Sequence, residues 1–258
     1  MDREHYTILE RQGRYYEGLE DGLGHYEEML NFISKNSLQD QTNYNHINTM
    51  MDTQNFLTYF ILQIYNANTD WPHKNIRFWR YENVQNEENL LPQLDGRWRW
   101  LVFDVDRSLG YVSYSHNTLK MVTDEFHHRN SDQRINFLLR ALLENDSFTL
   151  DFINEFADHL NTTFSHERVI DNIDTIKEAI KPEMTRHIDR WGMPTTYQEW
   201  LDNVDIMREF ALNRPGIVRQ HIIEHFNLSG TSKLHVMYHN SYGKIKVNTV
   251  SLSDNTWY

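Results

Sequence analysis

Two short stretches of the sequence carry residues whose types and spacing could do chemistry. Asp70 and Asn75 lie five positions apart in NANTDWPHKNIRFWR, which spans residues 66–80. This D-x-x-x-x-N spacing is that of a protein-kinase catalytic loop, in which the Asp receives a hydroxyl proton and the Asn holds a metal ion. The spacing therefore predicts a catalytic role for Asp70 and a metal-binding, cofactor-binding role for Asn75.

A second stretch, GRWRWLVFDVDRSLG, supplies two carboxylates, Asp104 and Asp106. Residues 75–81 and 97–106 are rich in aromatic and β-branched residues, which predicts a β-hairpin with a long loop. If the second strand stays regular to its end, alternation places Asp104 and Asp106 on one face. Two carboxylates and the Asn75 amide oxygen suit one or two Mg²⁺ ions that bridge phosphate oxygens.

Each motif also has an ordinary structural interpretation. Asp70 would cap a turn before Pro72, and Asp104 and Asp106 would end a strand at a loop. All four residues nevertheless follow one another in the order that a kinase-like site requires. This order favours a functional site over unrelated structural features.

The elements that must position these residues are predicted to be mostly helical. A nearly all-apolar helix over residues 56–65, capped by Asp52 or Thr53, precedes Asp70. Helical periodicity then extends from about residue 131 to 227. Within it, Ser165 and Thr196 are predicted helix caps, and Asn213-Arg214-Pro215 is predicted to end one helix and begin another. Five residues are predicted to form the core around the hairpin: Trp71, Phe78, Trp79, Trp98 and Trp100.

Composition limits the class of protein and its partners. The chain has 258 residues, 39% of them hydrophobic and 13% aromatic, as in a globular protein with a sizeable core. Its net charge of -12 disfavours nucleic acid and anionic membrane as partners. No apolar run approaches the roughly 20 residues of a membrane helix, so no transmembrane segment is expected. The absence of cysteine excludes disulfides and thiolate metal sites.

The organisation along the chain is uneven. Residues 1–24 are polar and contain glycine, and they are interpreted as a linker or a ragged N-terminal segment. Residues 25–228 are predicted to form one mainly helical domain that contains the hairpin. Residues 229–258 begin a β-rich module, in which KLHVMYHN and KIKVNTVSL alternate as a hairpin. A lone hairpin is marginal in water, so this module is expected to be cut short.

The sequence resembles the CotH kinases, a family of atypical, protein-kinase-like phosphotransferases named for spore coat protein H. The resemblance rests on NTDWPHKNIRFWR, on GRWRWLVFDVDRSLG and on the helical stretch from FINEFADHLNTTFSHERV to IKPEMTRHIDRWG. It covers roughly residues 25–226, in order. Carried over by position, Asp70 is similar to the catalytic-loop Asp and Asn75 to its metal-binding partner. The pair Asp104 and Asp106 resembles a substitute for the kinase D-F-G aspartate, with Asp104 as the first choice of ligand.

The resemblance implies a fold and an activity. The fold would be mainly α with a small β-hairpin, an α+β protein-kinase-like C-terminal lobe followed by the start of a β module. The activity would be Mg²⁺-dependent transfer of a phosphoryl group from ATP to a Ser or Thr hydroxyl of a protein. The family also suggests a bacterial protein, either secreted or associated with the cell envelope.

One feature of a kinase is not found in the sequence. A small lobe needs a phosphate-covering loop and a strand lysine, but Lys35 is the only lysine before Asp70. The glycines of GLEDGLG, at 18–24, are interrupted by acidic residues that would repel phosphate, and they are interpreted as a flexible turn. The small lobe is therefore expected to be absent from these residues, and the chain alone is expected to show little phosphotransfer.

Two other functions fit parts of the sequence. FDVDRSLG also resembles the first motif of haloacid dehalogenase-type phosphatases, with Asp104 as nucleophile and Asp106 as acid/base. That fold requires alternating strands and helices after the motif, which the helical stretch does not offer. A non-catalytic cell-surface binding module with a kinase-like lobe is the other alternative. His221 and His225 have the spacing of metal ligands but lack a third, and His127-His128 occupies a polar loop where substrate contacts could occur.

Overall fold

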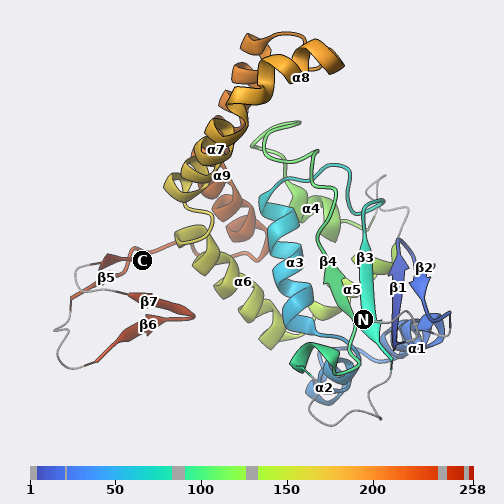
Figure 1. Cartoon of the computed structure of the whole chain (residues 1–258). Helices are drawn as coiled ribbons and strands as arrows, with labels where there is room; N and C mark the ends of the chain where they lie inside the picture. Colours follow the sequence, from blue (N-terminus) through green and yellow to red (C-terminus); the bar gives the residue numbers. More distant parts are fainter. Residues whose placement is uncertain (1–4, 21, 83–90, 126–132, 238–242, 253–255) are drawn as a thin grey trace. The chain divides into compact units, whose positions relative to one another are not determined.

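The computed structural model describes residues 5–20, 22–82, 91–125, 133–237, 243–252 and 256–258 (Figure 1). Its chain divides into two compact units. The first comprises residues 1–64, 68–107 and 118–152, and the second comprises 65–67, 108–117 and 153–258. Helices predominate, with small antiparallel sheets, so the predicted α+β class is confirmed.

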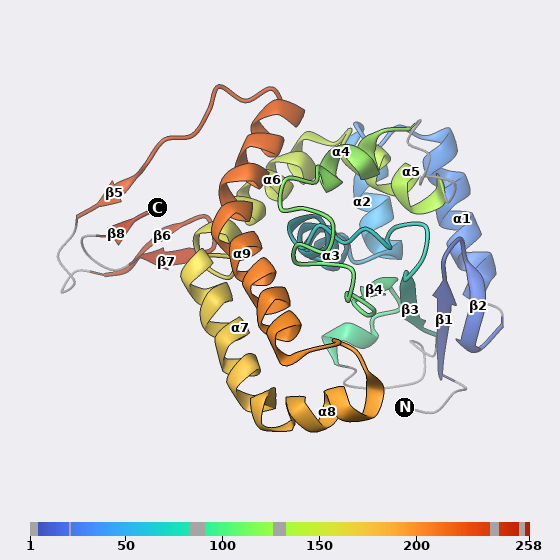
Figure 2. The ribbon, with the colours of Figure 1, turned by 90° about the horizontal axis from the view of Figure 1, so that it is seen from above.

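A four-stranded antiparallel sheet forms part of the first unit. Its strand order is β2-β1-β3-β4, made of β1 (Tyr6–Glu10), β2 (Arg14–Gly18), β3 (Arg77–Tyr81) and β4 (Arg99–Leu101) (Figure 2). The predicted hairpin is therefore present, with Phe78 of β3 opposite Trp100 of β4. The helices of this unit are α1 (Gly22–Lys35), α2 (Gln41–Met50), α3 (Thr53–Tyr65), α4 (Thr118–Thr123) and α5 (Gln133–Leu142), with a short 3-10 turn, η3 (Pro92–Leu94).

One face of this sheet forms an aromatic core. Phe78, Trp98 and Trp100 are buried, as predicted, and Trp71 is buried with them. The ring of Tyr26 from α1 lies 4.6 Å from that of Phe78. On α3, the ring of Phe56 lies 4.6 Å from that of Trp100. The core thus holds the hairpin against two helices; Trp79, on the opposite face, is only half-buried.

Residues 6–18, which were expected to belong to a linker, form β1 and β2 instead. The reason is a long-range pairing, because β1 lies between β2 and β3, with Ile8 opposite Trp79. Thr7 and Leu9 point inward and are buried, so the strand alternates despite its polar neighbours. At Gly22, the first residue of α1, an added Cβ would lie 2.4 Å from the Thr7 hydroxyl oxygen. Glycine therefore permits the close approach of this helix to β1.

The second unit is built on helices. They are α7 (His166–Ile180), η4 (Lys181–Glu183), α8 (Met184–Trp191) and α9 (Tyr197–His225), together with most of α6 (Asp146–Asn161), which begins in the first unit. Figures 1 and 2 show α7 and α9 side by side. They share a small core with α8, formed by Ile173, Met184, Trp200, Val204 and Ala211.

Helix ends follow the sequence prediction in most places. Asp52 caps α3, since its carboxylate accepts the N–H of Asn55 at 3.0 Å. Ser165 caps α7 and Thr196 caps α9, each through its hydroxyl oxygen. The predicted break at Pro215 is wrong, because α9 continues through it. Arg214 and Pro215 are both buried, so tertiary packing retains a helix that the proline alone would interrupt.

The C-terminal strands pair differently from the expected hairpin. β6 (Ile245–Val247) pairs with β7 (Val250–Leu252), and β5 (His235–Val236) pairs with β8 (Thr256–Trp257). Asn248 has a φ of 48°, which allows a two-residue turn inside the segment that was predicted to be one strand. This turn closes the β6–β7 hairpin. The preceding strand, β5, therefore pairs with β8, which follows β7 in the chain.

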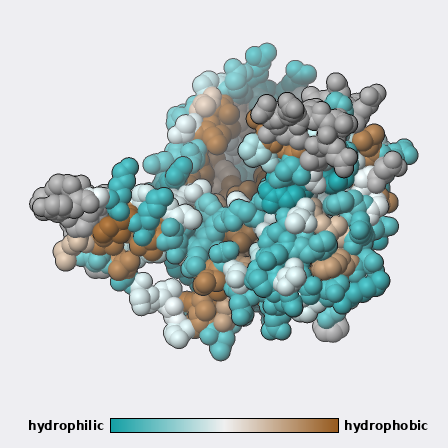
Figure 3. Space-filling model, turned by 90° about the horizontal axis from the view of Figure 1, so that it is seen from below, coloured by the Kyte–Doolittle hydropathy of each residue, from teal (hydrophilic) through white to brown (hydrophobic). Residues whose placement is uncertain are grey.

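One face of the molecule shows how polar and apolar residues are distributed on the surface (Figure 3). The face in Figure 3 is mainly hydrophilic, with separate hydrophobic patches, as the acidic composition leads us to expect. Within the described part of the chain, no helix combines the length and the apolarity needed to cross a bilayer.

Candidate functional site

Asp70 and Asn75 lie together in the segment that joins α3 to β3. The Asn75 side-chain N–H donates a hydrogen bond to the Asp70 carboxylate at 3.3 Å, and both residues are half-buried. The D-x-x-x-x-N spacing therefore brings the two predicted functional groups into direct contact. In the same loop, Trp71 is buried and its ring N–H donates to the Tyr59 hydroxyl at 2.8 Å, which fixes the chain beside Asp70.

The backbone of Asp70 is held by two buried amide side chains. The Asp70 N–H donates to the side-chain oxygen of Asn68 at 3.1 Å, and Asn68 in turn donates to the Gln63 side-chain oxygen at 2.9 Å. Both Asn68 and Gln63 have no exposed surface. Hydrogen bonds between buried polar groups restrict the conformations of the chain, so these two contacts position the backbone of Asp70.

Two basic side chains next to Asp70 were not singled out from the sequence. His73 Nε2 lies 3.7 Å and Lys74 Nζ lies 3.8 Å from one carboxylate oxygen of Asp70. Their positions three and four residues after the aspartate are the available sequence signal. The Lys74 side chain is 54% exposed, so it places a positive charge at the surface of this loop.

The segment that carries Asp104 and Asp106 lies beside the Asp70 segment. In the first unit, the Thr69 N–H donates to the Arg107 carbonyl oxygen at 3.2 Å. In the second unit, the Leu109 N–H donates to the Asn66 carbonyl oxygen at 3.0 Å. The Thr69–Arg107 hydrogen bond thus joins the two segments one residue before Asp70 and one residue after Asp106.

Asp104 and Asp106 do not lie on a strand. β4 ends at Leu101, so the expectation that alternation would place both carboxylates on one strand face is wrong. The physical reason is the backbone of Asp104, whose φ of 51° is left-handed and cannot continue a β-ladder. Both side chains are exposed.

A contact with the sheet holds Phe103, the residue directly before Asp104. The guanidinium carbon of Arg77, on β3, lies 4.4 Å from the centre of the Phe103 ring and 3.8 Å from that of Tyr16. Phe103 is therefore attached to the outer face of the sheet by a cation–π contact. Asp104 follows it directly in sequence.

Asn75 and Asp104 share an unusual backbone conformation. Their φ angles are 57° and 51°, in the left-handed region. Asn and Asp tolerate this region better than most residues, and non-glycine residues that adopt it are concentrated at functional sites. Two of the three residues that were predicted to bind metal thus have a left-handed backbone.

The available ligands fit magnesium better than a transition metal. Asn75, Asp104 and Asp106 offer only oxygen atoms, the ligands that Mg²⁺ prefers. In the described residues, no three His, Cys, Asp or Glu side chains gather into a metal-holding group. Mg²⁺ commonly uses one or two carboxylates and completes its shell with phosphate and water, so this open set is compatible with it. The convergence of these three residues on one ion stays a prediction.

Two pairs of histidines were also considered from the sequence as metal ligands or substrate contacts. His221 and His225 lie on α9, and burial lowers the pKa of both. His127-His128 lies outside the described residues.

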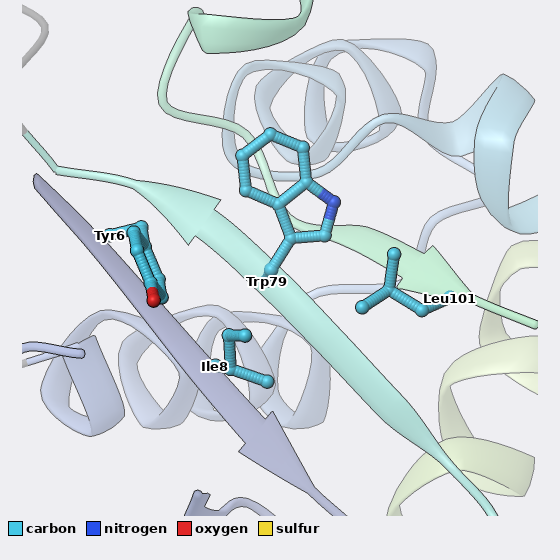
Figure 4. Close-up of a pocket in the computed structure, with 4 residues that line it drawn as sticks. All are labelled: Tyr6, Ile8, Trp79 and Leu101. Atoms are coloured by element: carbon cyan, nitrogen blue, oxygen red, sulfur yellow. The ribbon is translucent and has the colours of Figure 1, made fainter. Parts of the chain in front are cut away.

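An apolar pocket of about 310 Å³ lies on the outer face of the sheet. Figure 4 shows its lining: Tyr6 and Ile8 from β1, Trp79 from β3 and Leu101 from β4. Leu101 is three residues before Asp104, and Trp79 is four residues after Asn75. Besides β1, the pocket therefore involves β3, which follows Asn75 in the sequence, and β4, which precedes Asp104.

Comparison with known proteins identifies a family. The model of the family described as CotH kinase protein matches residues 2–218. This match includes β1 and β2, which the resemblance noted from the sequence did not cover. No curated protein matches the chain.

Proposed function

The chain belongs to the CotH kinase family, and on that premise we propose that it carries the phosphotransferase site described above. The reaction would move a phosphoryl group from ATP to a Ser or Thr hydroxyl of a protein, with Mg²⁺. The observation that carries the proposal is the pairing of two loops: Asp70 contacts Asn75, and the Thr69–Arg107 hydrogen bond holds the Asp106 segment beside them.

Asp70 would orient the acceptor hydroxyl and accept its proton. Phosphoryl transfer passes through a loose transition state, so the carboxylate takes the proton late and acts mainly by positioning. The Asn75 amide and the Asn68–Gln63 pair hold Asp70 in place for this task. Lys74, whose amine lies 3.8 Å from the Asp70 carboxylate, would add positive charge near the transferred group.

Asn75, Asp104 and Asp106 would hold magnesium through their oxygen atoms. When bound, the ion would supply neutralisation of the phosphate charge. Asp104 is the favoured principal ligand, because Phe103 is fixed on Arg77 directly before it. Asp106 is one residue from the Thr69–Arg107 contact and would be the second carboxylate.

The apolar pocket on the sheet would receive the adenine ring. Tyr6, Ile8, Trp79 and Leu101 offer the apolar and aromatic surface on which a planar base can stack. At about 3.3 Å per residue, the three residues from Leu101 to Asp104 span roughly 10 Å of extended chain. This spacing would separate a base subsite on the strands from a phosphate subsite in the segment that follows β4.

The competing functions receive less support. Between β4 and β5, the described residues form helices and no strand, whereas a haloacid dehalogenase-type phosphatase requires both in alternation. A non-catalytic binding module has no particular observation in its favour, and it becomes an outcome of the experiment below.

The proposal is tested by binding and transfer measurements on the protein at its natural length. We expect ATP binding that strengthens with Mg²⁺, and transfer of label from [γ-³²P]ATP to Ser/Thr peptides. Trp79→Ala should weaken ATP binding by roughly tenfold or more, as loss of a stacked base contact does. Trp191→Ala is the matched control, because this tryptophan is 64% exposed on α8. Binding without transfer would indicate a non-catalytic module, and neither would refute the proposal.

A further inference from the structure

Arg214 is a fully buried arginine on α9 that makes three hydrogen bonds to backbone carbonyls. Its Nε donates to the Tyr65 carbonyl oxygen at 2.8 Å. Its Nη1 donates to the carbonyl oxygens of Tyr114 and His116, each at 2.7 Å. All four residues lie in the second unit. Burial lowers the pKa of Arg214 to about 10, so the group remains charged at neutral pH.

These carbonyls belong to two chain segments that are continuous in sequence with the loops of the candidate site. Tyr65 is the last residue of α3 and directly precedes the segment that leads to Asp70. Tyr114 and His116 lie in the segment 108–117, which follows Asp106. A single guanidinium therefore joins the start of one loop to the end of the other.

Other contacts show that α9 is the common support of both segments. The Tyr65 ring packs 5.9 Å from the Phe210 ring. At Gly110, where φ is +98°, an added Cβ would lie 3.0 Å from Cγ2 of Ile206. Between the segments, the Leu109 N–H donates to the Asn66 carbonyl at 3.0 Å. Arg214 and its neighbours on α9 therefore contact both of the paired segments, 65–67 and 108–117.

We propose that Arg214 is a positioning residue, which holds the 65–67 and 108–117 segments in the register that places Asp70 and the Asp104–Asp106 loop for phosphotransfer. This inference rests on the proposed function. A planar guanidinium can bind several carbonyls at once with fixed geometry, whereas lysine presents a single ammonium on a flexible chain. The Tyr65 contact is buried and the other two are partly buried, so loss of the donor leaves these carbonyls poorly satisfied and the segments should loosen locally.

The test uses Arg214→Lys and Arg214→Gln in the protein at its natural length, with Arg208→Lys as the matched control. Arg208 lies on the same helix but binds Asp174 and Asp205 at the surface. Hydrogen exchange measures the segments without reference to activity. In the Arg214 variants we expect the Leu109 amide and its neighbours in 108–117 to exchange about tenfold faster or more, with no such change for Arg208→Lys.

Kinetics then connect this loosening to the reaction. Displacement of reacting groups by about 1 Å can reduce transfer about 10²-fold, so kcat should fall by that order. KM for ATP should stay nearly constant, because the base pocket is lined by sheet residues of the first unit. A merely structural residue would not produce this separation of kcat from KM. Arg214→Lys should retain more activity than Arg214→Gln, since it keeps a charge and a donor.

Several outcomes would overturn the inference. The inference would be wrong if hydrogen exchange in 108–117 were unchanged, or if Arg208→Lys had an equal effect. It would also be wrong if the Arg214 variants lost kcat and ATP binding equally. Global unfolding of both Arg214 variants would also overturn it, because the residue would then support the whole unit rather than these segments. If the wild type transfers no phosphate but the Arg214 variants still exchange faster in 108–117, the contact role of Arg214 stands. The proposed function would then be wrong.

Discussion

Thr69 donates its backbone N–H to the carbonyl oxygen of Arg107 at 3.2 Å, and its hydroxyl lies 3.4 Å from the same oxygen. Thr69 is 5% exposed, so this contact is protected from water. It matters because Asp70 is the next residue after Thr69, and Asp106 is the residue before Arg107. Two carboxylates that are far apart in sequence are thereby held on neighbouring segments, an arrangement that is compatible with the proposed metal-assisted transfer.

Asp70→Asn should reduce phosphotransfer while leaving nucleotide binding almost unchanged. The amide keeps the shape of the side chain but removes the negative charge that, in the proposed mechanism, would accept the hydroxyl proton. General-base contributions are about 10²–10⁴-fold, so the rate should fall by that order. Single-turnover transfer and calorimetric ATP binding measure the two effects. A wild-type rate for Asp70→Asn would show that this residue has no catalytic role, as a phosphatase using Asp104 would predict.

Asp104→Asn should instead weaken Mg²⁺-dependent nucleotide binding as well as the rate. The substitution would remove a charged group that is proposed as a metal ligand, and interactions of charged groups of this kind correspond to roughly 10–100-fold in affinity. ATP titrations with MgCl₂ and with EDTA provide the measurement, and only the affinity with MgCl₂ should change. Asp106→Asn serves as the comparison. A larger effect at Asp106 than at Asp104 would reverse the assignment of the principal ligand.

Local patterns in the sequence predicted local structure well. The hairpin of β3 and β4 followed from aromatic and β-branched runs, and the caps at Asp52, Ser165 and Thr196 followed from short-range hydrogen-bonding chemistry. The contact of Asp70 with Asn75 was also predictable, because both residues occupy one short loop.

Features that depend on distant partners were not predictable. β1 is stabilised by β3, about 70 residues away, and its five residues favour a strand locally without showing which partner they pair with. The second strand does not run through Asp104, because this residue adopts a left-handed backbone, and residue type only permits this conformation without requiring it. Pro215 stays inside α9 because buried neighbours hold the helix on both sides. In each case tertiary packing outweighed local propensity.

The hairpin should lose stability at acidic pH through Asp95. Burial opposes ionisation of this carboxyl group, but hydrogen bonds from the Arg99 side chain and from the N–H and side chain of Arg97 outweigh it and lower the pKa of Asp95 to about 2. A carboxyl group whose folded pKa is depressed stabilises the fold above its unfolded pKa, here 3.8, and this stabilisation disappears as pH falls toward 2. The contribution is about 1–2 kcal/mol, reduced by partial exposure.

Asp95→Asn is the variant that measures this contribution. The free energy of unfolding should be lower than that of the wild type at pH 6, and the two values should converge near pH 2. Asp151→Asn, an exposed position on α6, provides the control. Urea denaturation at pH 6, 4 and 2 makes the comparison. A difference that stays constant over this range would show that the ionised Asp95 does not stabilise the fold.

Asp158 should determine whether the C-terminal strands stay attached to α6. It is 3% exposed, and its carboxylate accepts the Thr249 N–H at 2.8 Å and the Asn248 side-chain N–H at 3.2 Å. The hydroxyl groups of Thr249 and Tyr258 also donate to it. Burial opposes ionisation, but these hydrogen bonds lower the pKa of Asp158. One charged group thus binds the β6–β7 turn and the Tyr258 side chain together.

Asp158→Asn removes the charge and replaces one acceptor with a donor that faces the N–H groups of Thr249 and Asn248. Because a two-stranded hairpin is marginal by itself, the segment from residue 244 to 252 should open at least about 100-fold more often. Hydrogen exchange of the Leu252 amide and limited proteolysis near Lys244 and Lys246 report this opening, with Asp151→Asn as control. The wild type should behave similarly when pH falls below the depressed pKa. Unchanged protection of residues 244–252 in Asp158→Asn would show that other contacts hold these strands.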